Sequence, residues 1–583
     1  MTNYANVWSA GGLFAFSGLD GKTSFGEPFV ASGTTDRVGW DFWLEPRLVL
    51  EANCGTNALR PKTEPESFCF SDCWDFPVSA GDATGRCRGA FLDRASMLLS
   101  IQTNSASDPC VPELEAVGEE PAGSGERIIA RSNCWVAIMQ SEPARIRSFA
   151  IAISYTNEDE ARERARKALV SDINAAIEAR LLFYTSVQAP MRLTTNDEPI
   201  FYKALNVIKT NFESAQDDIP CRWTTPDRMP HRRMWLWDSA FHAVGARHLS
   251  ARLGEEAIYA LFAKQRDDGK LALAVHPGNM KVEESDTQPP IVAWAVWKQF
   301  QLSENQEFLE GLYDGLARYL QWFEQNRRNS NGLYGWQVRA EDDPIRGARG
   351  GESGMDNSPR FDNVGAMTAV DLCSYLAAEY LVMKKIAKQL GYSADVAKWH
   401  RRQQAIIERA NELLWDDEDR FYYDLDEDGA PILVKTVAGL LALHGRLADH
   451  DRAEALRTHL TNPMEFWPVL PVPTVARDEE CFSNDMWRGP TWLNINQLLF
   501  YALEQYGFLE EARLVARITI DEAARWYRAK GCIYEYYDCL GEMAPPDMPR
   551  KGAPGAAGGV GFGVIADYHW SAAAIVDLLY AIC

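Results

Sequence analysis

Two carboxylates in unusual loop settings are the strongest chemical signal in the sequence. Asp356 lies in the loop GGESGMDNSPRFD at 350–362, where glycines and turn-forming residues direct the backbone. Glu535 lies in CIYEYYD at 532–538, between aromatic residues and ahead of a glycine-rich stretch at 552–563. Hydrolysis of a glycosidic bond requires two acids, because one protonates the leaving oxygen while the other activates water or attacks the sugar. The two loops therefore predict a glycosidase-type acid pair.

The loop around Asp356 belongs to a longer stretch without helical periodicity. With residues 334–343 it makes about thirty residues between two helical segments, and a loop of that length is usually functional or disordered. The alternative is a solvated turn with no chemical role, which the same composition also allows. Spacing along the sequence does not by itself bring Asp356 and Glu535 together.

Five segments stand out along the helical part of the chain. They are WLWDSAF (235–241), DTQPPIVAWAV (286–296), ESGMDNSPRFD (352–362), MWRGPTWLNIN (486–496) and IYEYYD (533–538). Their order and approximate spacing resemble those of glycoside hydrolase family 63, and the resemblance covers residues 195–583. That family includes processing α-glucosidases and bacterial mannosylglycerate and glucosylglycerate hydrolases, and the trehalases of family 37 are similar.

The resemblance implies an exo-acting α-glycosidase that inverts the anomeric configuration, most simply an α-glucosidase acting on short α-glucosides. Asp356 matches the general acid of the family and Glu535 matches its general base. Such an acid keeps its proton in dry or like-charged surroundings, and Met355 with tryptophans from other loops is expected to form a dry wall. Inversion requires the two carboxyl groups to lie about 6.5–9.5 Å apart, so that a water fits beside the sugar.

Further residues match family positions that bind the substrate. Trp235 and Asp238 lie three residues apart at a predicted helix start, so one helix face carries both toward the deepest subsite. The amide of Gln288 precedes two prolines that open a helix, and it can donate to and accept from a sugar hydroxyl. The remaining predicted substrate-binding residues are Asn357, Arg360, Trp487, Arg488, Trp492, His569 and Trp570.

Some of these assignments leave alternatives open. Asp238 also suits the N-cap of the helix that follows it, and the tryptophans also suit core packing. Arg360 and Arg488 are expected either to hold the carboxylates or to bind an acidic group of the substrate. Glu352 is expected to orient Arg360 or to act on the acid through its like charge.

The sequence departs from the family where the leaving group would lie. Met355 stands where many members have Trp, and residues 538–541 read DCLG in place of the usual Pro-x-Thr-Gly. The glycine-rich stretch before His569 is also long. The aglycone is therefore not predicted, and the loops at 335–351 and 542–566 are candidates to close over the substrate.

Composition excludes several classes of partner. The formal charge of −23, from 59 Lys and Arg against 82 Asp and Glu, argues against nucleic acid or an anionic membrane. The chain has 19 Trp, 21 Tyr and 25 Phe, and such rings suit the apolar faces of a small-molecule glycoside. The N-terminus has no basic region followed by an apolar run, and no window approaches a membrane span. A cytoplasmic protein is expected.

The cysteines and acidic runs predict no metal and no cofactor. Twelve cysteines without an export signal are expected to be reduced thiols. Cys69 and Cys73 invite a metal interpretation, but no nearby His or Cys pair completes a zinc-type spacing. DLDEDG at 424–429 imitates a calcium loop, but Lys435 occupies the position of the bidentate acid, so a turn is predicted.

The elements that must position these residues divide the chain into three parts. Short apolar or alternating runs predict an N-terminal β-sandwich over residues 1–155, and residues 156–194 predict a helical linker built on one long helix near 158–187. Residues 195–583 are almost wholly helical, and paired helices suggest an (α/α)6 toroid with a central pocket, so the fold class is mainly α. The twelve predicted helices span 196–215, 236–250, 253–266, 289–302, 305–327, 363–390, 394–414, 431–447, 450–460, 489–506, 508–527 and 570–582.

Other functions are compatible with this fold. An α-mannosidase or a trehalase-type hydrolase would use the same acids, whereas lyase or epimerase chemistry would call for a His or Tyr base. A non-catalytic carbohydrate-binding protein belongs to a different class, and it has no physical need for both Asp356 and Glu535.

Overall fold

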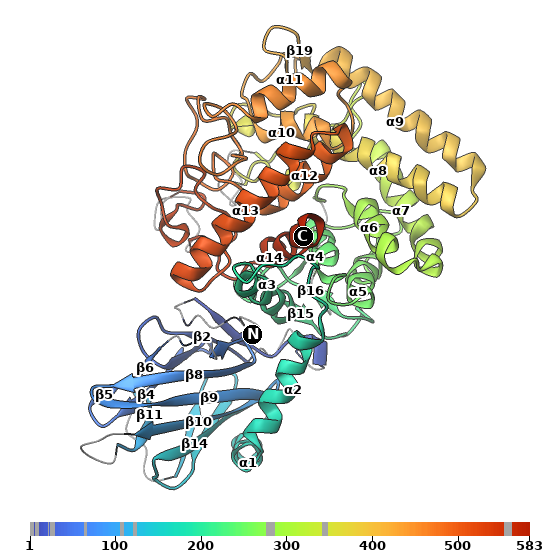
Figure 1. The fold of residues 1–583 in the computed structure, drawn as a ribbon. Coiled ribbons are helices and arrows are strands. Elements are labelled where there is room, and N and C mark those ends of the chain that lie inside the picture. The colour runs from blue at the N-terminus through green and yellow to red at the C-terminus, as the bar shows by residue number, and fades with distance from the viewer. Residues whose placement is uncertain are drawn as a thin grey trace.

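The structure is a computed structural model, and Figure 1 shows the strands of the N-terminal part packed beside a larger helical part. It describes the chain except residues 1–4, 6–7, 9–10, 21–22, 24–28, 63, 65–66, 105–109, 120–124, 276–285, 341–347 and 553–562. The central portions of the two candidate lid loops, and most of the glycine-rich stretch at 552–563, lie outside the described residues.

The N-terminal part forms two antiparallel sheets, as its β pattern predicts. One sheet has the order β1 (Leu13–Ala15), β2 (Val30–Gly33), β3 (Gly39–Phe42), β4 (Leu48–Cys54) and β11 (Pro112–Ala116), with β5 (Asn57–Ala58) beside β4. The other has the order β12 (Glu126–Ala130), β13 (Trp135–Gln140), β14 (Ile146–Ser154), β10 (Ser96–Asn104), β9 (Ala83–Asp93), β8 (Cys73–Ala80) and β6 (Arg60–Pro61), with β7 (Phe68–Cys69) beside β8.

The two sheets share one apolar core. Strand β4 alternates buried and half-buried residues, as expected for a strand with one face on a core. Trp40 and Leu50 of the first sheet belong to the same cluster as Met97 and Phe149 of the second. Face-to-face packing of this kind explains the short apolar and alternating runs of the sequence.

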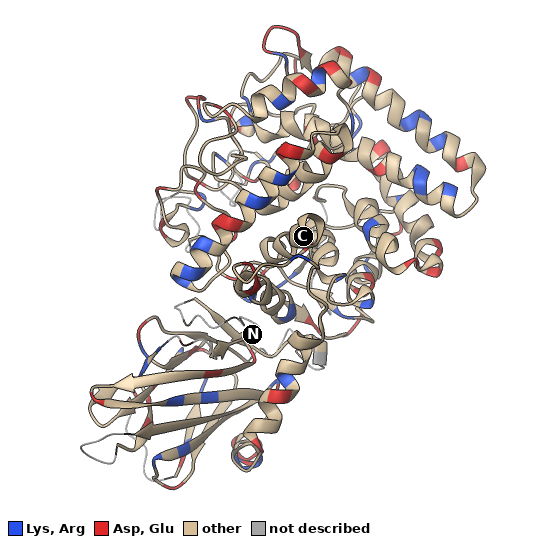
Figure 2. Cartoon of the chain, viewed as in Figure 1, with Lys and Arg blue, Asp and Glu red and all other residues tan. Residues whose placement is uncertain are grey.

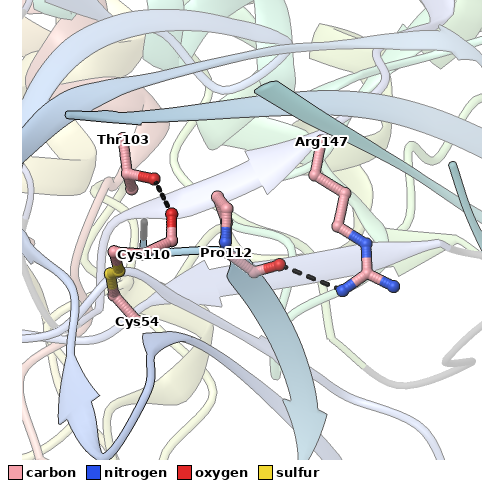
Figure 3. The surroundings of a disulfide bond; sticks show 5 residues. All are labelled: Cys54, Thr103, Cys110, Pro112 and Arg147. Atoms are coloured by element: carbon pink, nitrogen blue, oxygen red, sulfur yellow. Dashed lines mark hydrogen bonds between the residues drawn. A yellow bond between two sulfur atoms is a disulfide. The ribbon is translucent and has the colours of Figure 1, made fainter. Parts of the chain in front are cut away.

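A disulfide joins the two strands at one end of the β4–β11 pair, which differs from the expectation that all cysteines are reduced. Cys54 is bonded to Cys110, with a Cα–Cα distance of 5.6 Å (Figure 3). The register of the sheet sets Cys54 opposite Pro112, and this brings together two cysteines that are 56 residues apart. Thr103 Oγ1 donates to the Cys110 carbonyl, and Arg147 Nη1 donates to the Pro112 carbonyl at 3.1 Å. Cys69 and Cys73 are free buried thiols.

The predicted long helix at 158–187 is two helices, α1 (Glu158–Leu169) and α2 (Ile173–Ser186). The break occurs because Asp172 acts as an N-cap, accepting from the backbone N–H groups of Asn174 at 2.9 Å and Ala175 at 3.3 Å. Apolar residues recur at helical intervals on both sides of the break, so the sequence pattern did not reveal the N-cap at Asp172.

The rest of the chain is helical, with twelve α-helices near the predicted positions among the residues that the structure describes. The segment predicted at 431–447 contains only the short α10 and η4, so that helix was predicted too long. The helices are α3 (Glu198–Thr210), α4 (Leu236–Ala246), α5 (Ala251–Phe262), α6 (Val292–Ser303), α7 (Gln306–Asn326), α8 (Val370–Gln389), α9 (Ser393–Leu413), α10 (Val437–Leu440), α11 (His450–Leu460), α12 (Leu493–Tyr506), α13 (Leu509–Lys530) and α14 (His569–Ile582).

Short elements occupy the connections. The 3-10 turns are η1 (Gly18–Asp20), η2 (Gly351–Ser353), η3 (Pro359–Phe361), η4 (Leu441–Leu443) and η5 (Pro545–Asp547). The two-residue strands pair as β15 (Phe212–Glu213) with β16 (Trp223–Thr224), β17 (Met234–Trp235) with β18 (Ala274–Val275), and β19 (Trp415–Asp416) with β20 (Phe421–Tyr422).

Six helical elements contact one another in a closed ring. Each contacts the next in the order α4, α6, α8, the α10–η4 turn, α12 and α14, and α14 returns to α4. The helices α5, α7, α9, α13 and α3 pack against α4, α6, α8, α12 and α14 respectively. Figure 2 shows many charged residues along α9 and α13. By contrast, Asp238 is the only charged residue of α4 and Asp577 the only one of α14, as expected for helices buried on all sides.

Buried ion pairs join the sheets to the helical part. Lys209 of α3 lies 2.6 Å from Asp72 of the N-terminal part, and the two side chains are 2% and 1% exposed. Asp567, which precedes α14, accepts from Lys203 of α3 at 2.8 Å and from the backbone N–H of Leu13 in β1 at 3.3 Å. No helix within the described ranges is both long and apolar enough to cross a lipid bilayer.

Candidate active site

A pocket of about 400 Å³, partly open to solvent, lies at one end of the helical ring. Its lining residues precede or begin the inner helices α4, α6, α8, α12 and α14, so the pocket forms where the N-termini of these helices converge. The lining residues are His231, Trp235, Trp237, Asp238, Gln288, Gly354, Asp356, Met486, Trp487, Trp492, Glu535, Arg550, Tyr568 and Trp570. Asp356 and Glu535, which are 179 residues apart in sequence, therefore face one cavity.

Glu535 is a buried carboxylate held by an arginine. Arg550 donates to both of its oxygens, Nε to Oε2 and Nη2 to Oε1, each at 3.0 Å. The side chains of Arg550 and Glu535 are only 5% and 2% exposed. The Ile565 N–H adds a longer bond of 3.4 Å to Oε2, and the backbone N–H of Glu535 donates to the Ile565 carbonyl at 2.9 Å. This residue is fixed in orientation and protected from bulk water.

Asp356 is the more exposed of the two predicted acids, with 23% of its side chain accessible. The Lys551 ammonium lies 2.5 Å from its Oδ2. From the sequence, dry or like-charged surroundings are expected for the proton donor. Asp356 does not have them, because it is partly exposed and its nearest charged neighbour is a cation. The ammonium of Lys551 therefore occupies one acceptor oxygen of Asp356.

Asp238 has the surroundings that were expected for the acid. Burial raises the pKa of Asp238 well above its ordinary value, and the negative charges of Glu535, Asp227 and Asp356 raise it further. The N-cap alternative is wrong, because α4 begins at Leu236 with Trp235 in the cap position. Asp238 lines the pocket, and in its protonated form it can donate a hydrogen bond to a sugar hydroxyl.

The pocket wall is aromatic. Trp487 and Trp492 stack with their ring centroids 3.7 Å apart, and Trp570 meets both Trp492 and Trp237 edge-on at 5.4 Å. Trp487 is 1% and Trp492 0% exposed, so the two rings belong to the core and line the pocket at once. Flat apolar rings beside carboxylates suit a sugar, which has apolar C–H faces and a polar edge.

Close contacts fix the floor of the pocket. The backbone N–H of Trp237 donates to Oε1 of Gln288 at 3.1 Å, so the NH₂ group of Gln288 is left as the donor toward the cavity. Gly354 has φ of +74°, and a Cβ at this position would lie 2.3 Å from the Trp237 ring. Glycine is therefore favoured at position 354 for two reasons: the backbone is left-handed there, and the Trp237 ring leaves no room for a Cβ.

Four of the predicted substrate-binding residues do not line the pocket. Asn357 accepts from the Trp487 N–H at 3.0 Å, and Arg488 donates to the Asn357 carbonyl at 3.2 Å, so these two tie the Asp356 loop to the turn before α12. Arg360 is buried between Asp371 and Asp424. His569 stacks on a second buried histidine, and burial lowers the pKa of His569 to about 3.

The expected roles of two arginines and one glutamate also change. Arg488 pairs with Asp362 at 2.9 and 2.7 Å, and neither it nor Arg360 touches the predicted acids in the described contacts. Glu352 is bound by Arg327 at 2.8 and 2.6 Å, so it does not orient Arg360. These ion pairs shape the loop that carries Asp356, and none of the three residues lines the cavity.

Sequence reasoning missed several lining residues. Trp237 stands inside the WLWDSAF segment and could have been found there. Tyr568 could have been found from its position next to His569 and Trp570. His231 and Arg550 sit in segments without a recognisable pattern, and only their folded positions bring them to the cavity.

Comparisons with known proteins identify relatives of the chain. A family model described as the mannosylglycerate hydrolase MGH1-like glycoside hydrolase domain matches residues 230–543. The mannosylglycerate hydrolase of Thermus thermophilus is 26% identical over 422 residues, covering 58% of this chain and 94% of that protein. An uncharacterized protein of Borreliella burgdorferi is 24% identical over 294 residues, covering 48% of this chain and only 58% of that protein.

Solved structures extend the likeness in fold to the N-terminal part. A bacterial glucoamylase in complex with acarbose superposes with a TM-score of 0.59 at 10% identity, covering 100% of this chain and 96% of that chain. At that identity the likeness concerns the fold alone. The family match is the stronger finding, since it spans more than half of the 583 residues and includes both predicted acids. The chain belongs to the mannosylglycerate hydrolase MGH1-like glycoside hydrolases, a family-63 type, and it is a glycoside hydrolase.

Proposed function

We propose that the protein is an inverting, exo-acting α-glycosidase in which Asp356 is the general acid and Glu535 the general base. The observation that carries the proposal is the presence of both carboxylates on one cavity walled by tryptophans. We further propose that the ring of paired helices is an (α/α)6 toroid, that it forms a catalytic domain over residues 195–583, and that residues 1–155 form a separate β-sandwich domain joined by a linker at 156–194.

In the proposed reaction, Asp356 gives its proton to the glycosidic oxygen as the bond to the anomeric carbon breaks. A water attacks that carbon from the opposite face, and its proton passes to Glu535. The products are the free sugar of inverted configuration and the neutral alcohol of the leaving group, and a proton has moved from Asp356 to Glu535. Asp238 would bind a hydroxyl of the same sugar ring, with Trp235, Gln288 and the stacked tryptophans around it.

For the substrate we propose a short α-glucoside, with the corresponding α-mannoside as the second candidate. The name of the Thermus relative suggests glycerate as the leaving group. Lys551 supports an acidic leaving group, because a substrate carboxylate could replace Asp356 as the partner of its ammonium. That exchange would also release Asp356 Oδ2 from its contact with Lys551.

Proton NMR of the first-released anomer tests the proposal on glucosyl- and mannosyl-glycerate, α,α-trehalose and methyl α-glycosides. Release of the β-anomer, abolished by Asp356→Asn and by Glu535→Gln, is the expected result. Glu542→Gln serves as the control, since this carboxylate is exposed and follows Glu535 on the same loop. Release of the α-anomer would mean retention, and absence of turnover on every glycoside would contradict the proposal.

A further inference from the structure

The proposed base has a partner that carries charge in a buried site. Arg550 and Glu535 form two parallel hydrogen bonds, which fix the plane of the carboxylate more tightly than a single contact would. Burial is the largest single influence and lowers the pKa of Arg550, but the charge of Glu535 and the hydrogen bonds to it together raise that pKa by more, so the guanidinium stays charged. Removing either partner would leave the other charge buried without compensation.

The hydrogen bonds leave one oxygen of Glu535 better placed for chemistry. Oε2 accepts from Arg550 Nε and from the Ile565 N–H, whereas Oε1 accepts from Arg550 Nη2 alone among the described contacts. An ionised carboxylate offers about two acceptor sites on each oxygen. Oε1 therefore keeps an acceptor site for the proton of an attacking water.

Arg550 is itself held from its far side. Its Nη2 lies 3.4 Å from Nε2 of His231, and a guanidinium can only donate, so His231 Nε2 is the acceptor. The imidazole must then carry its proton on Nδ1, which donates to Asp227 Oδ2 at 2.7 Å. Asp227 Oδ1 also accepts from the His231 backbone N–H at 2.9 Å, and Asp227 is fully buried. The chain of contacts runs from Asp227 through His231 and Arg550 to Glu535.

Hydrogen bonds hold the chain segment around Arg550 on both sides of that residue. Tyr536, the neighbour of Glu535, donates its hydroxyl to the Pro549 carbonyl at 2.7 Å. On the other side the Gly552 N–H donates to Asp485 Oδ2 at 2.8 Å. Arg550 lies beyond the matched family region, which ends at residue 543, so the family match does not assign it.

From these contacts we propose that Arg550 is the positioning residue of the base. It fixes the plane of the Glu535 carboxylate so that Oε1 can accept the proton of the attacking water, and His231 with Asp227 holds the guanidinium on its other side. The inference rests on the proposed function, because it concerns the same reaction. It assigns Arg550 no contact with the reacting atoms.

The test compares Arg550→Met, Arg550→Lys and Arg550→Ala with the wild type in kcat, KM and pH profile. We expect Arg550→Met to lower kcat about 100-fold with KM changed less than about threefold, and Arg550→Lys to lose about tenfold because it keeps the charge without the fork. The acid limb of the profile should move up by roughly one to three pH units in Arg550→Met, since a buried carboxylate without its cation binds a proton more readily. Added guanidinium should restore activity to Arg550→Ala.

Arg222→Met is the matched control. Arg222 binds Glu256 with the same pairing of atoms, Nε to Oε2 and Nη2 to Oε1, at a site outside the pocket. This variant should keep the wild-type kcat and pH profile. Guanidinium rescue guards against a folding defect, because a misfolded variant would not regain activity.

The outcomes separate the two proposals. An active wild type whose acid limb is unchanged in Arg550→Met, or whose Arg550→Ala variant is not rescued, would overturn the positioning role while leaving the proposed function intact. A wild type inactive on every glycoside would overturn the proposed function, and the positioning role would fall with it.

Discussion

Replacing Lys209 by Met should destabilise the whole protein, because it breaks a buried ion pair between the sheet part and the helices. Lys209 lies 2.6 Å from Asp72, and both side chains are at most 2% exposed. Breaking one partner of a buried pair costs about 3–5 kcal/mol, since the remaining charge loses its compensation. An unfolding entropy of about 2.1 cal/mol/K per residue over 583 residues is roughly 1.2 kcal/mol/K, so the Tm should fall by about 3–4 °C.

The assay is differential scanning calorimetry of Lys209→Met, Asp72→Asn and the double variant. The double variant should be less destabilised than the sum of the single variants, because it removes both charges together. Lys167→Met is the control: Lys167 and Glu163 form an exposed pair at 3.7 Å on α1, and such pairs contribute less than about 1 kcal/mol. A Lys209→Met protein that melts within about 1 °C of the wild type would refute the reasoning.

Three further predictions follow from the same structure. Gly354→Ala should lower kcat/KM at least about tenfold, because the added Cβ would push the Trp237 ring aside. Gly332→Ala is the control: its φ is +88° and its added Cβ would meet no atom nearer than 3.9 Å, so it should show only the backbone strain. Steady-state kinetics and thermal melting of both variants check this. Because the pKa of Asp238 is raised, wild-type stability should fall as the pH rises from about 4 through that raised pKa, and the Tm of Asp238→Asn measured over the same range should lack this fall. A reductant should lower the wild-type Tm by about 3 °C, because the disulfide closes a loop of 56 residues worth about 4 kcal/mol, and the Tm of Cys54→Ser should not respond.

Much of the architecture could be predicted because local patterns are strong in this chain. The alternation of apolar and polar residues in the N-terminal part predicted the strands. The helical periodicity of the rest of the chain predicted most helix ends to within several residues of their observed positions. The failures have local causes. The side chain of Asp172 caps a new helix inside a continuous apolar pattern, and the segment at 431–447 makes only short turns. The disulfide was missed because the pairing of Cys54 with Cys110 depends on the register of β4 and β11.

The site divides in the same way. Asp356, Glu535 and the tryptophans lie in segments whose composition and order are informative, and the structure brings them to one cavity. Arg360 and Arg488 lie in those segments too, yet they bind carboxylates that support the loops. A charged residue in a motif can serve the shape of the loop as readily as the substrate, and sequence alone does not separate these two uses. Arg550 is the opposite case. It lies outside the recognised segments, yet the fold brings it to the pocket, where it binds Glu535.

Asp567 links the N-terminal sheets to the segment that carries Glu535. Its carboxylate accepts from the backbone N–H of Leu13 in β1 at 3.3 Å and from that of Ile533, two residues before Glu535, at 3.2 Å. Lys203 of α3 neutralises it from a third direction at 2.8 Å. One buried carboxylate thus connects the first sheet, helix α3 and the segment that carries the proposed base. In the proposed mechanism one oxygen of Glu535 accepts the proton of a water, and we expect the contact of Asp567 with β1 to help hold the segment of the base in position.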